Sequence, residues 1–359
     1  MKKIFFYAAA AAVVSLSLTS CSDDDDNILE PVVSPVAEGL YIVCNGNYMA
    51  GNGSLSYYNP ADNTIENDIF LRANGMKLGD TAQSMMIDGE TGWICVNGSN
   101  TIYAINLSDY QVKGQIKGIT SPRNVLSVSS DKLYATSLYD NRIAIINPAD
   151  YSISGYIDIP EMEGSTGSTE QLVKVGDYVY VNCWSYQKEI LKIDSRTDKV
   201  VDRLEVGIQP ESIAYDGDSS LWVLCDGGGW EQNPIGFEAP TLVCVDLQAF
   251  EVERTIQLAE YSSVSELTYF DNNLYWLENG VQKMSVNAVS APASPFIPTT
   301  SYALYSLTVN PSNGDIYVGD AIDYMQNGTV TRYNSAGNEV DSFTTGIIPA
   351  GFCWKLSKE

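Results

Sequence analysis

Short runs of alternating apolar and polar residues, separated by turn-forming Gly, Asn, Asp and Pro, fill most of the chain after residue 39. Seven of these runs open on a pair whose second member is Tyr or Trp. The pairs recur at roughly 40 to 50 residues, the period of β-propeller blades. They are Leu40-Tyr41, Gly92-Trp93, Leu133-Tyr134, Val179-Tyr180, Leu221-Trp222, Leu274-Tyr275 and Ile316-Tyr317.

The third unit shows the order of strands within one repeat. Its pair opens a run over 133–136, and two further β-type runs follow over 142–147 and 153–159. A fourth run, 122–128, precedes the pair and begins with Pro122. Four short strands with turn residues between them fit a sheet blade rather than a helical solenoid.

The last residues of the chain complete this pattern. Residues 351–356 match the strand that normally precedes a pair, whereas the first unit begins directly at its pair. The sequence therefore predicts an all-β fold, a seven-bladed β-propeller of four-stranded antiparallel blades over residues 39–359, in which the C-terminal strand completes the first blade. The alternatives are a β-sandwich or two separate β domains, which would not require a fixed order of motifs.

The repeat chemistry points to a known type of propeller. Residues 206–217 contain Gly207-Ile208-Gln209-Pro210 and lead to Leu221-Trp222-Val223. This stretch resembles the YVTN-type propeller repeat, whose Gly-x-x-Pro start places a turn before the innermost strand. The resemblance concerns the fold and carries no information about chemistry.

The amino terminus resembles a bacterial lipoprotein signal. Lys2 and Lys3 precede an apolar stretch over 4–18 that is too short to span a bilayer as a stable helix. Leu18-Thr19-Ser20-Cys21 follows it and resembles a lipobox. We therefore expect residues 1–20 to be a signal peptide and Cys21 to become the first residue of the mature chain, carrying palmitate-type acyl groups. An ordinary secretory signal is the alternative.

Ser22 to Asn27 form an acidic run that resembles the export signal of Bacteroides surface lipoproteins, and residues 21–38 would be the tether. Taken together, lipobox, acidic run and propeller resemble the BtuG family. That resemblance implies capture of cobalamin and related corrinoids at the outer face of the outer membrane. It also implies delivery to a TonB-dependent transporter of the BtuB type, with no cofactor besides cobalamin as the bound ligand.

Composition narrows the function classes. The 359 residues include 20 Lys and Arg against 45 Asp and Glu, with a formal charge of −25, so nucleic acid is a poor partner. There is no histidine, which removes the commonest catalytic and metal-binding side chain. The 23 tyrosines suit surfaces that contact neutral, partly apolar ligands. We expect a binding protein without catalytic residues rather than an enzyme.

The cysteines other than Cys21 are expected to be small core residues. No C-x-x-C motif occurs, so no zinc or iron–sulfur site is predicted. Cys44, Cys183 and Cys225 share one position in the repeat, which indicates a common packing environment. Disulfide pairing in an oxidising compartment stays open.

Long loops between the second and third strands of several blades carry aromatic side chains. In a propeller these loops share a face with the segments that lead into the innermost strands. Loops of this length with Tyr and Trp are typical of binding loops, although each aromatic could instead pack against its own loop. The candidate contacts to a corrin ring are Tyr48, Tyr139, Trp184, Tyr186, Trp230, Phe237 and Tyr324.

Polar residues at the start of the innermost strands should line the channel mouth. Gln83, Arg123 and Glu211 are the candidate ligand contacts there. Arg123 could donate to a ligand amide or phosphate, or form an ion pair with Glu211 or Glu170. Glu170, Glu211 and Glu266 could instead hold calcium, as in propeller lactonases, which would make the chain a calcium-dependent hydrolase. A glycan or another nutrient is the remaining alternative ligand.

Overall fold

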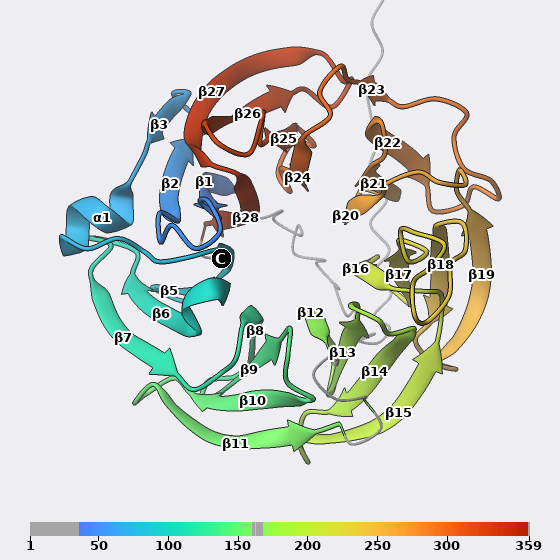
Figure 1. The fold of residues 1–359 in the computed structure, drawn as a ribbon, viewed down its shortest axis with the longest axis horizontal. Coiled ribbons are helices and arrows are strands. Elements are labelled where there is room, and N and C mark those ends of the chain that lie inside the picture. Colours follow the sequence, from blue (N-terminus) through green and yellow to red (C-terminus); the bar gives the residue numbers. More distant parts are fainter. Residues whose placement is uncertain (1–35, 160–161, 163–167, 358–359) are drawn as a thin grey trace, which may run out of the picture. The chain divides into compact units, whose positions relative to one another are not determined.

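In a computed structural model, which describes residues 36–159, 162 and 168–357, twenty-eight strands form seven antiparallel sheets of four strands each. The sheets stand around a central axis like the blades of a propeller (Figure 1). The predicted all-β, seven-bladed propeller is confirmed.

Each blade starts with its innermost strand at the axis and continues outward. The first blade contains β28 (Pro349–Leu356), β1 (Ala37–Cys44), β2 (Ser54–Asn59) and β3 (Thr64–Glu66). The second contains β4 (Ala82–Asp88), β5 (Thr91–Val96), β6 (Thr101–Asn106) and β7 (Val112–Lys117). The third contains β8 (Pro122–Ser129), β9 (Lys132–Ser137), β10 (Arg142–Asn147) and β11 (Ser152–Asp158). The fourth contains β12 (Thr169–Val175), β13 (Tyr178–Cys183), β14 (Glu189–Asp194) and β15 (Lys199–Glu205).

The fifth blade contains β16 (Pro210–Tyr215), β17 (Ser220–Cys225), β18 (Thr241–Asp246) and β19 (Glu251–Gln257). The sixth contains β20 (Ser265–Phe270), β21 (Asn273–Leu277), β22 (Gly280–Ser285) and β23 (Ile297–Pro298). The seventh contains β24 (Leu304–Val309), β25 (Ile316–Asp320), β26 (Asn327–Tyr333) and β27 (Glu339–Ile347). A short α-helix, α1 (Ile69–Asn74), and a 3₁₀ turn, η1 (Asn97–Ser99), lie in connections of the first two blades.

The two ends of the described chain close the ring in the first blade. β1 lies beside β28 (Figure 1). The two strands pair antiparallel, with Leu40 opposite Trp354. Val36 and Ser357 extend this contact: the Val36 N–H donates to Ser357 Oγ at 3.1 Å, and the Ser357 N–H donates to the Val36 carbonyl at 2.7 Å. The predicted contribution of the C-terminal strand to the first blade is confirmed. β1 begins at Ala37, two residues before the expected domain boundary.

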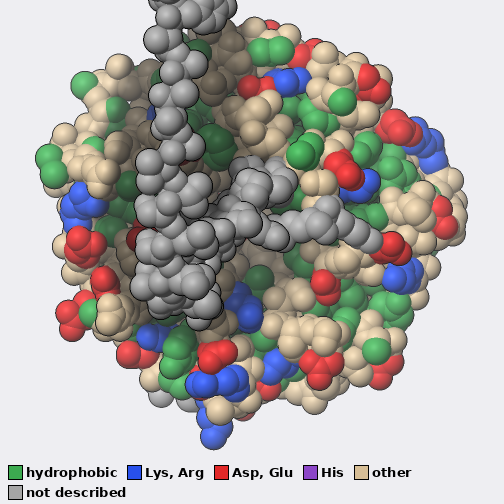
Figure 2. Space-filling view, turned by 180° about the vertical axis from the view of Figure 1, so that it is seen from behind, with side chains coloured by type: hydrophobic (Ala, Val, Ile, Leu, Met, Phe, Trp, Pro, Cys, Tyr) green, Lys and Arg blue, Asp and Glu red, His purple; other side chains and the backbone are tan. Residues whose placement is uncertain are grey.

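The repeated aromatic residues form the packing between blades. All seven are buried on the second strand of their blade, and five of them lie under a Lys or Arg side chain. These cations are Lys132 over Tyr134, Lys192 over Tyr180, Arg254 over Trp222, Lys283 over Tyr275 and Arg332 over Tyr317. Five of the 20 Lys and Arg side chains thus form cation–π contacts with these buried rings. On the face seen in Figure 2, basic and acidic side chains lie interspersed around the outer edge of the propeller.

The six cysteines in the described part of the chain are free thiols. Cys44, Cys183 and Cys225 each end the second strand of a blade and are buried, as their shared repeat position predicts. Burial raises the pKa of the Cys44 thiol to about 11, so it stays protonated and acts as a small core residue. Cys353 is less buried than the other five.

The predicted signal peptide, the lipidated Cys21 and the acidic run lie outside the described residues. Within the residues that are described, no helix is long and apolar enough to cross a bilayer.

Candidate functional site

Every innermost strand carries a bulge at its second residue, and these seven residues face the axis. In β4, Ala82 pairs with Val96 and Ser84 pairs with Cys95, which leaves Gln83 out of the ladder. A bulge re-aims the side chain of the extra residue. The equivalent residues, called the mouth ring below, are Gln83, Arg123, Glu170, Glu211, Glu266, Tyr305 and Ala350.

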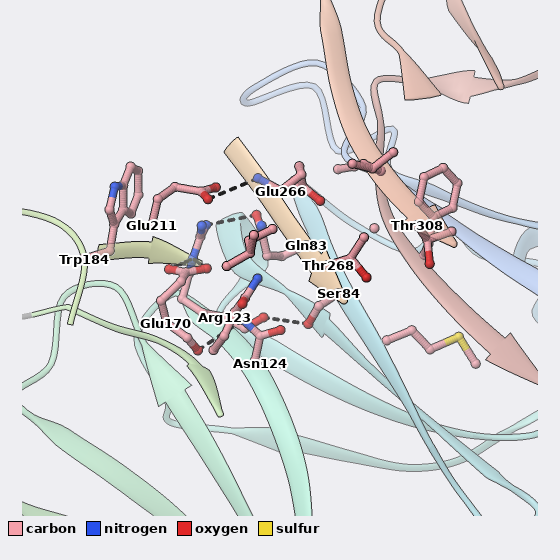
Figure 3. Close-up of a pocket in the computed structure, with 17 residues that line it drawn as sticks. Gln83, Ser84, Arg123, Asn124, Glu170, Trp184, Glu211, Glu266, Thr268 and Thr308 are labelled. Carbon is pink, nitrogen blue, oxygen red and sulfur yellow. Dashed lines mark hydrogen bonds and ion pairs between the residues drawn. The ribbon is translucent and has the colours of Figure 1, made fainter. Parts of the chain in front are cut away.

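The mouth ring surrounds a cavity of about 260 Å³ on the axis. All of its members except Tyr305 line this cavity, together with Trp184 and residues that follow in the same strands (Figure 3). The predicted mouth residues Gln83, Arg123 and Glu211 therefore lie together. Their shared environment is polar and is enclosed by the seven innermost strands.

Arg123 is held by two neighbouring blades. Its Nε lies 2.7 Å from Glu170 Oε2, and its Nη1 donates to Gln83 Oε1 at 2.9 Å (Figure 3). The guanidinium also lies 5.9 Å from the centre of the Trp184 ring. Burial lowers the pKa of Arg123, but the Glu170 carboxylate outweighs this effect and raises it. Of the two ion pairs considered from the sequence, the structure contains the one with Glu170.

Glu211 and Glu266 form a second polar cluster in the cavity. The backbone N–H of Glu266 donates to Glu211 Oε2 at 3.1 Å (Figure 3). Burial raises the pKa of Glu211 to about 7. Burial and, next, the charge of Glu211 raise the pKa of Glu266 well above its usual range. Two neighbouring carboxyl groups in one cavity disfavour simultaneous ionisation, so a proton is retained near neutral pH.

Residues that directly follow mouth-ring positions tie neighbouring blades together. Ser84 Oγ donates to the Arg123 carbonyl at 2.6 Å, and Asn124 Nδ2 donates to the Glu170 carbonyl at 3.1 Å. In the same way, the Leu267 N–H donates to Ser212 Oγ at 2.9 Å. These bonds run around the ring, and they hold the walls of the cavity in place before any ligand arrives.

The aromatic loops lie beside the segments that enter the innermost strands. Backbone hydrogen bonds join the two sets: Leu138 N–H to the Ser121 carbonyl at 3.0 Å, Trp184 to Ser168 at 3.2 Å, and Asp226 to Gln209 at 3.0 Å. An Ala321 to Ala303 bond at 2.8 Å does the same in the seventh blade. The loops expected to share one face with the mouth are therefore attached to its rim.

Most of the predicted aromatic contacts are exposed on these loops. The exposed fraction is 80% for Tyr48, 55% for Tyr139, 44% for Trp230 and 40% for Tyr324. Trp184 differs, because its Nε1 donates to Asp226 Oδ2 at 2.9 Å and its ring lies beside Arg123. Trp184 is therefore part of the cavity wall rather than a free loop tip.

The remaining aromatic side chains of these loops and of the segments that enter the innermost strands occur in pairs, and together with the exposed ones they are called the aromatic rim below. Tyr186 meets Trp230 edge-on at 6.2 Å between ring centres, Phe237 stacks on Tyr261 at 5.3 Å, and Tyr305 meets Tyr324 edge-on at 6.1 Å. Tyr261 and Tyr302, which are 67% and 82% exposed, were not among the contacts expected from the sequence. Both lie in segments that lead into an innermost strand, and this position is the signal that could have found them.

Asp226 joins three of the loops. Besides the bond from Trp184, it accepts a hydrogen bond from Gln209 Nε2 at 2.9 Å and one from the Gly228 N–H at 2.7 Å. Gly227, Gly228 and Gly229 all have positive φ, which allows this tight turn before Trp230. No sequence pattern indicates these hydrogen bonds to Asp226, because their donors come from three separate segments.

The raised pKa of Glu211 predicts a pH-dependent stability. Its ordinary value is 4.5, so its contribution is fully present below pH 4.5 and is lost as the pH rises through about 7. We expect the unfolding free energy of the parent to fall between pH 5 and pH 8 relative to that of the Glu211→Gln variant, which lacks the titrating group. Urea denaturation at the two pH values measures this difference. The exposed Glu339→Gln is the control. A difference independent of pH would contradict the raised pKa of Glu211.

Comparison with known proteins identifies the family. Residues 38–346 match the model described as "Domain of unknown function (DUF5074)", and the chain belongs to this family. No curated protein matches. A quinonprotein alcohol dehydrogenase-like protein from Bacteroides thetaiotaomicron VPI-5482 is similar in structure, with a TM-score of 0.66 and 13% identity over 89% of this chain and 79% of that one.

Two further solved structures share the architecture. Kuenenia stuttgartiensis hydrazine synthase has a TM-score of 0.56 and 13% identity, over 75% of this chain and 88% of that one. The computationally designed Ika8 protein has a TM-score of 0.56 and 10% identity, over 86% of this chain and 90% of that one. At these identities the likeness concerns the propeller fold alone.

Proposed function

We propose that the chain is a non-catalytic capture protein for cobalamin and related corrinoids, of the BtuG type. The observation that carries the proposal is the arrangement of aromatic side chains on loops that are bonded to the rim of a polar axial cavity. A corrin ring offers a broad apolar body fringed with amides. Stacking area from Tyr and Trp and hydrogen bonds from the mouth ring complement those two features.

The geometry of the rim supports tight binding. Aromatic pairs such as Tyr186–Trp230 limit the rotamers of both rings before a ligand arrives. The Asp226 hydrogen bonds hold the loops that carry these rings, and inter-blade bonds hold the cavity wall. A preformed surface loses little conformational entropy on binding, which raises affinity for a given contact area.

We further propose that the propeller is displayed on the outer membrane through an acylated Cys21 and delivers its ligand to a TonB-dependent transporter of the BtuB type. The lipobox and the acidic run after it support this proposal. Labelling with a palmitate analogue tests it, since the Cys21→Ser variant should lose the label.

The calcium-dependent hydrolase receives less support. Among the described residues no group of three or more acidic or cysteine side chains is placed to hold a metal ion. Of the three glutamates considered for such a cage, Glu170 is bound to Arg123. A glycan remains the main competitor for the aromatic rim.

The direct test is co-elution with coloured ligand. The purified protein is mixed with excess cyanocobalamin and passed through a desalting column. We expect red absorbance to travel with the protein at one equivalent, unchanged by a calcium chelator. A colourless protein peak would contradict corrinoid capture, and glycan arrays would then test the competing ligand.

Truncation of a rim aromatic should weaken binding without affecting the fold. We expect Trp230→Ala to reduce the affinity for cyanocobalamin by about 1–3 kcal/mol, the loss of a stacking anchor, with an unchanged melting temperature, as measured by calorimetry. Tyr156→Ala is the matched control, because this ring lies on the third blade's outermost strand, β11. Equal effects of both substitutions on affinity would place the ligand away from the rim.

A further inference from the structure

The charges in the axial cavity are unequally paired. Arg123 is the only cation among the described residues that line it. Its Nε forms an ion pair with Glu170 Oε2 at 2.7 Å. Glu211 and Glu266 face the same cavity, and the described lining residues offer them no second cation. The cavity therefore contains one neutralised ion pair and two further carboxyl groups.

Those two carboxyl groups interact with each other and with the groups around them. Glu211 accepts a hydrogen bond from the backbone of Glu266, so the two residues adjoin. The other titratable groups that face them come from four further segments of the ring. They are Glu170 on β12, Arg123 on β8, Asp226 after β17 and Tyr305 on β24.

Glu211 and Glu266 are thus half-buried neighbours that face one cavity, and a third carboxylate repels both. Burial raises the pKa of both. Near neutral pH a proton stays on the pair. One of the two groups then offers a carboxyl O–H donor and the other a carboxylate oxygen acceptor to the same cavity.

The size of the cavity limits what part of a ligand can enter. Its volume of about 260 Å³ is below the roughly 300–1,000 Å³ of pockets that enclose a whole small molecule. A corrinoid held here would therefore rest its body on the aromatic rim and place one peripheral side chain in the mouth.

We propose that the axial cavity is a carboxamide subsite, which accepts a neutral amide side chain of the ligand and rejects a carboxylate at the same place. This inference rests on the proposed function. A primary amide presents a carbonyl acceptor and N–H donors, which match the O–H donor and the carboxylate oxygen of the pair. A ligand carboxylate would meet Glu211 and Glu266 with like charge, while Arg123 is already paired, which is a strong basis for rejection.

The test compares cyanocobalamin with its monocarboxylic acid derivatives, in which one peripheral amide is hydrolysed. At pH 8 we expect at least one derivative to bind about tenfold more weakly, or worse, than the parent. This loss of affinity should be smaller at pH 5, where the carboxyl groups are protonated. The double variant Glu211→Gln/Glu266→Gln should show a smaller loss of affinity at pH 8, whereas the exposed Glu339→Gln variant should show the same loss as the parent. Equal binding of all derivatives at pH 8 would overturn the inference.

A second arm does not depend on corrinoids. Propionamide and propionate are titrated into the protein, and the side-chain amide NMR signals of Gln83 and Asn124, which line the cavity, are followed. We expect shifts with propionamide and none with propionate at pH 8. If cyanocobalamin fails to bind but propionamide shifts these signals, the proposed function fails and the amide subsite stands. If cyanocobalamin binds and propionate shifts them as propionamide does, the subsite inference alone fails.

Discussion

Replacing Trp222 by alanine is expected to destabilise the protein by about 3–5 kcal/mol, the cost of removing a large buried aromatic side chain. Trp222 is 1% exposed and packs in a cluster that contains residues of the fifth and sixth blades, among them Leu267 and Trp276. Its Nε1 has no hydrogen-bond partner among the described residues, so the expected loss is one of packing and of the contact with Arg254 at 5.1 Å.

Urea denaturation followed by tryptophan fluorescence and circular dichroism measures this effect. Trp230→Ala is the matched control, because it removes the same side chain from an exposed loop and should leave the unfolding free energy almost unchanged. A loss below about 1 kcal/mol for Trp222→Ala would contradict its placement between two blades.

Replacing Arg123 by methionine is the second large effect. The substitution leaves the carboxylate of Glu170, 8% exposed, without its cation, and breaking a buried pair in this way costs about 3–5 kcal/mol. It also removes the donor to Gln83 and the contact with Trp184. We therefore expect lower stability and weaker ligand binding together.

A double substitution separates the two causes of instability. Arg123→Met combined with Glu170→Gln removes the uncompensated charge, so it should recover much of the unfolding free energy. Arg72→Met, which breaks an exposed ion pair with Glu66, is the control and should change stability little. If the double variant is as unstable as Arg123→Met, the loss comes from packing rather than from an unpaired charge.

The fold was predictable because equivalent strands of the blades carry the same types of residue at the same positions. The aromatic second member of each pair is buried at the same place in every blade, so Tyr41, Trp93, Tyr134 and the others recur at the blade period. The closing strand was predictable for the same reason, since β28 supplies the one position that the first unit lacks.

The details of the site depend on contacts that a single sequence does not specify. Arg123 could have paired with Glu211 or Glu170, since bulges aim all three side chains at the axis. It pairs with Glu170, which lies on the adjacent blade, whereas Glu211 lies one blade further round the ring. Trp184 was expected on a loop tip, but a hydrogen bond to Asp226, in the next blade, turns it to the cavity. Such contacts join residues 42 and 47 positions apart, so no local sequence pattern predicts them.

A corrinoid bound over the mouth ring is the central expectation. Crystals of the complex with cyanocobalamin, measured at a wavelength near the cobalt absorption edge, test it directly through the anomalous signal of the metal. We expect one cobalt peak close to the propeller axis, on the side of the rim aromatics Trp230 and Tyr324 and above Arg123 and Glu211. A cobalt peak at the outer edge of the blades, or on the opposite face beside Lys355, would contradict it.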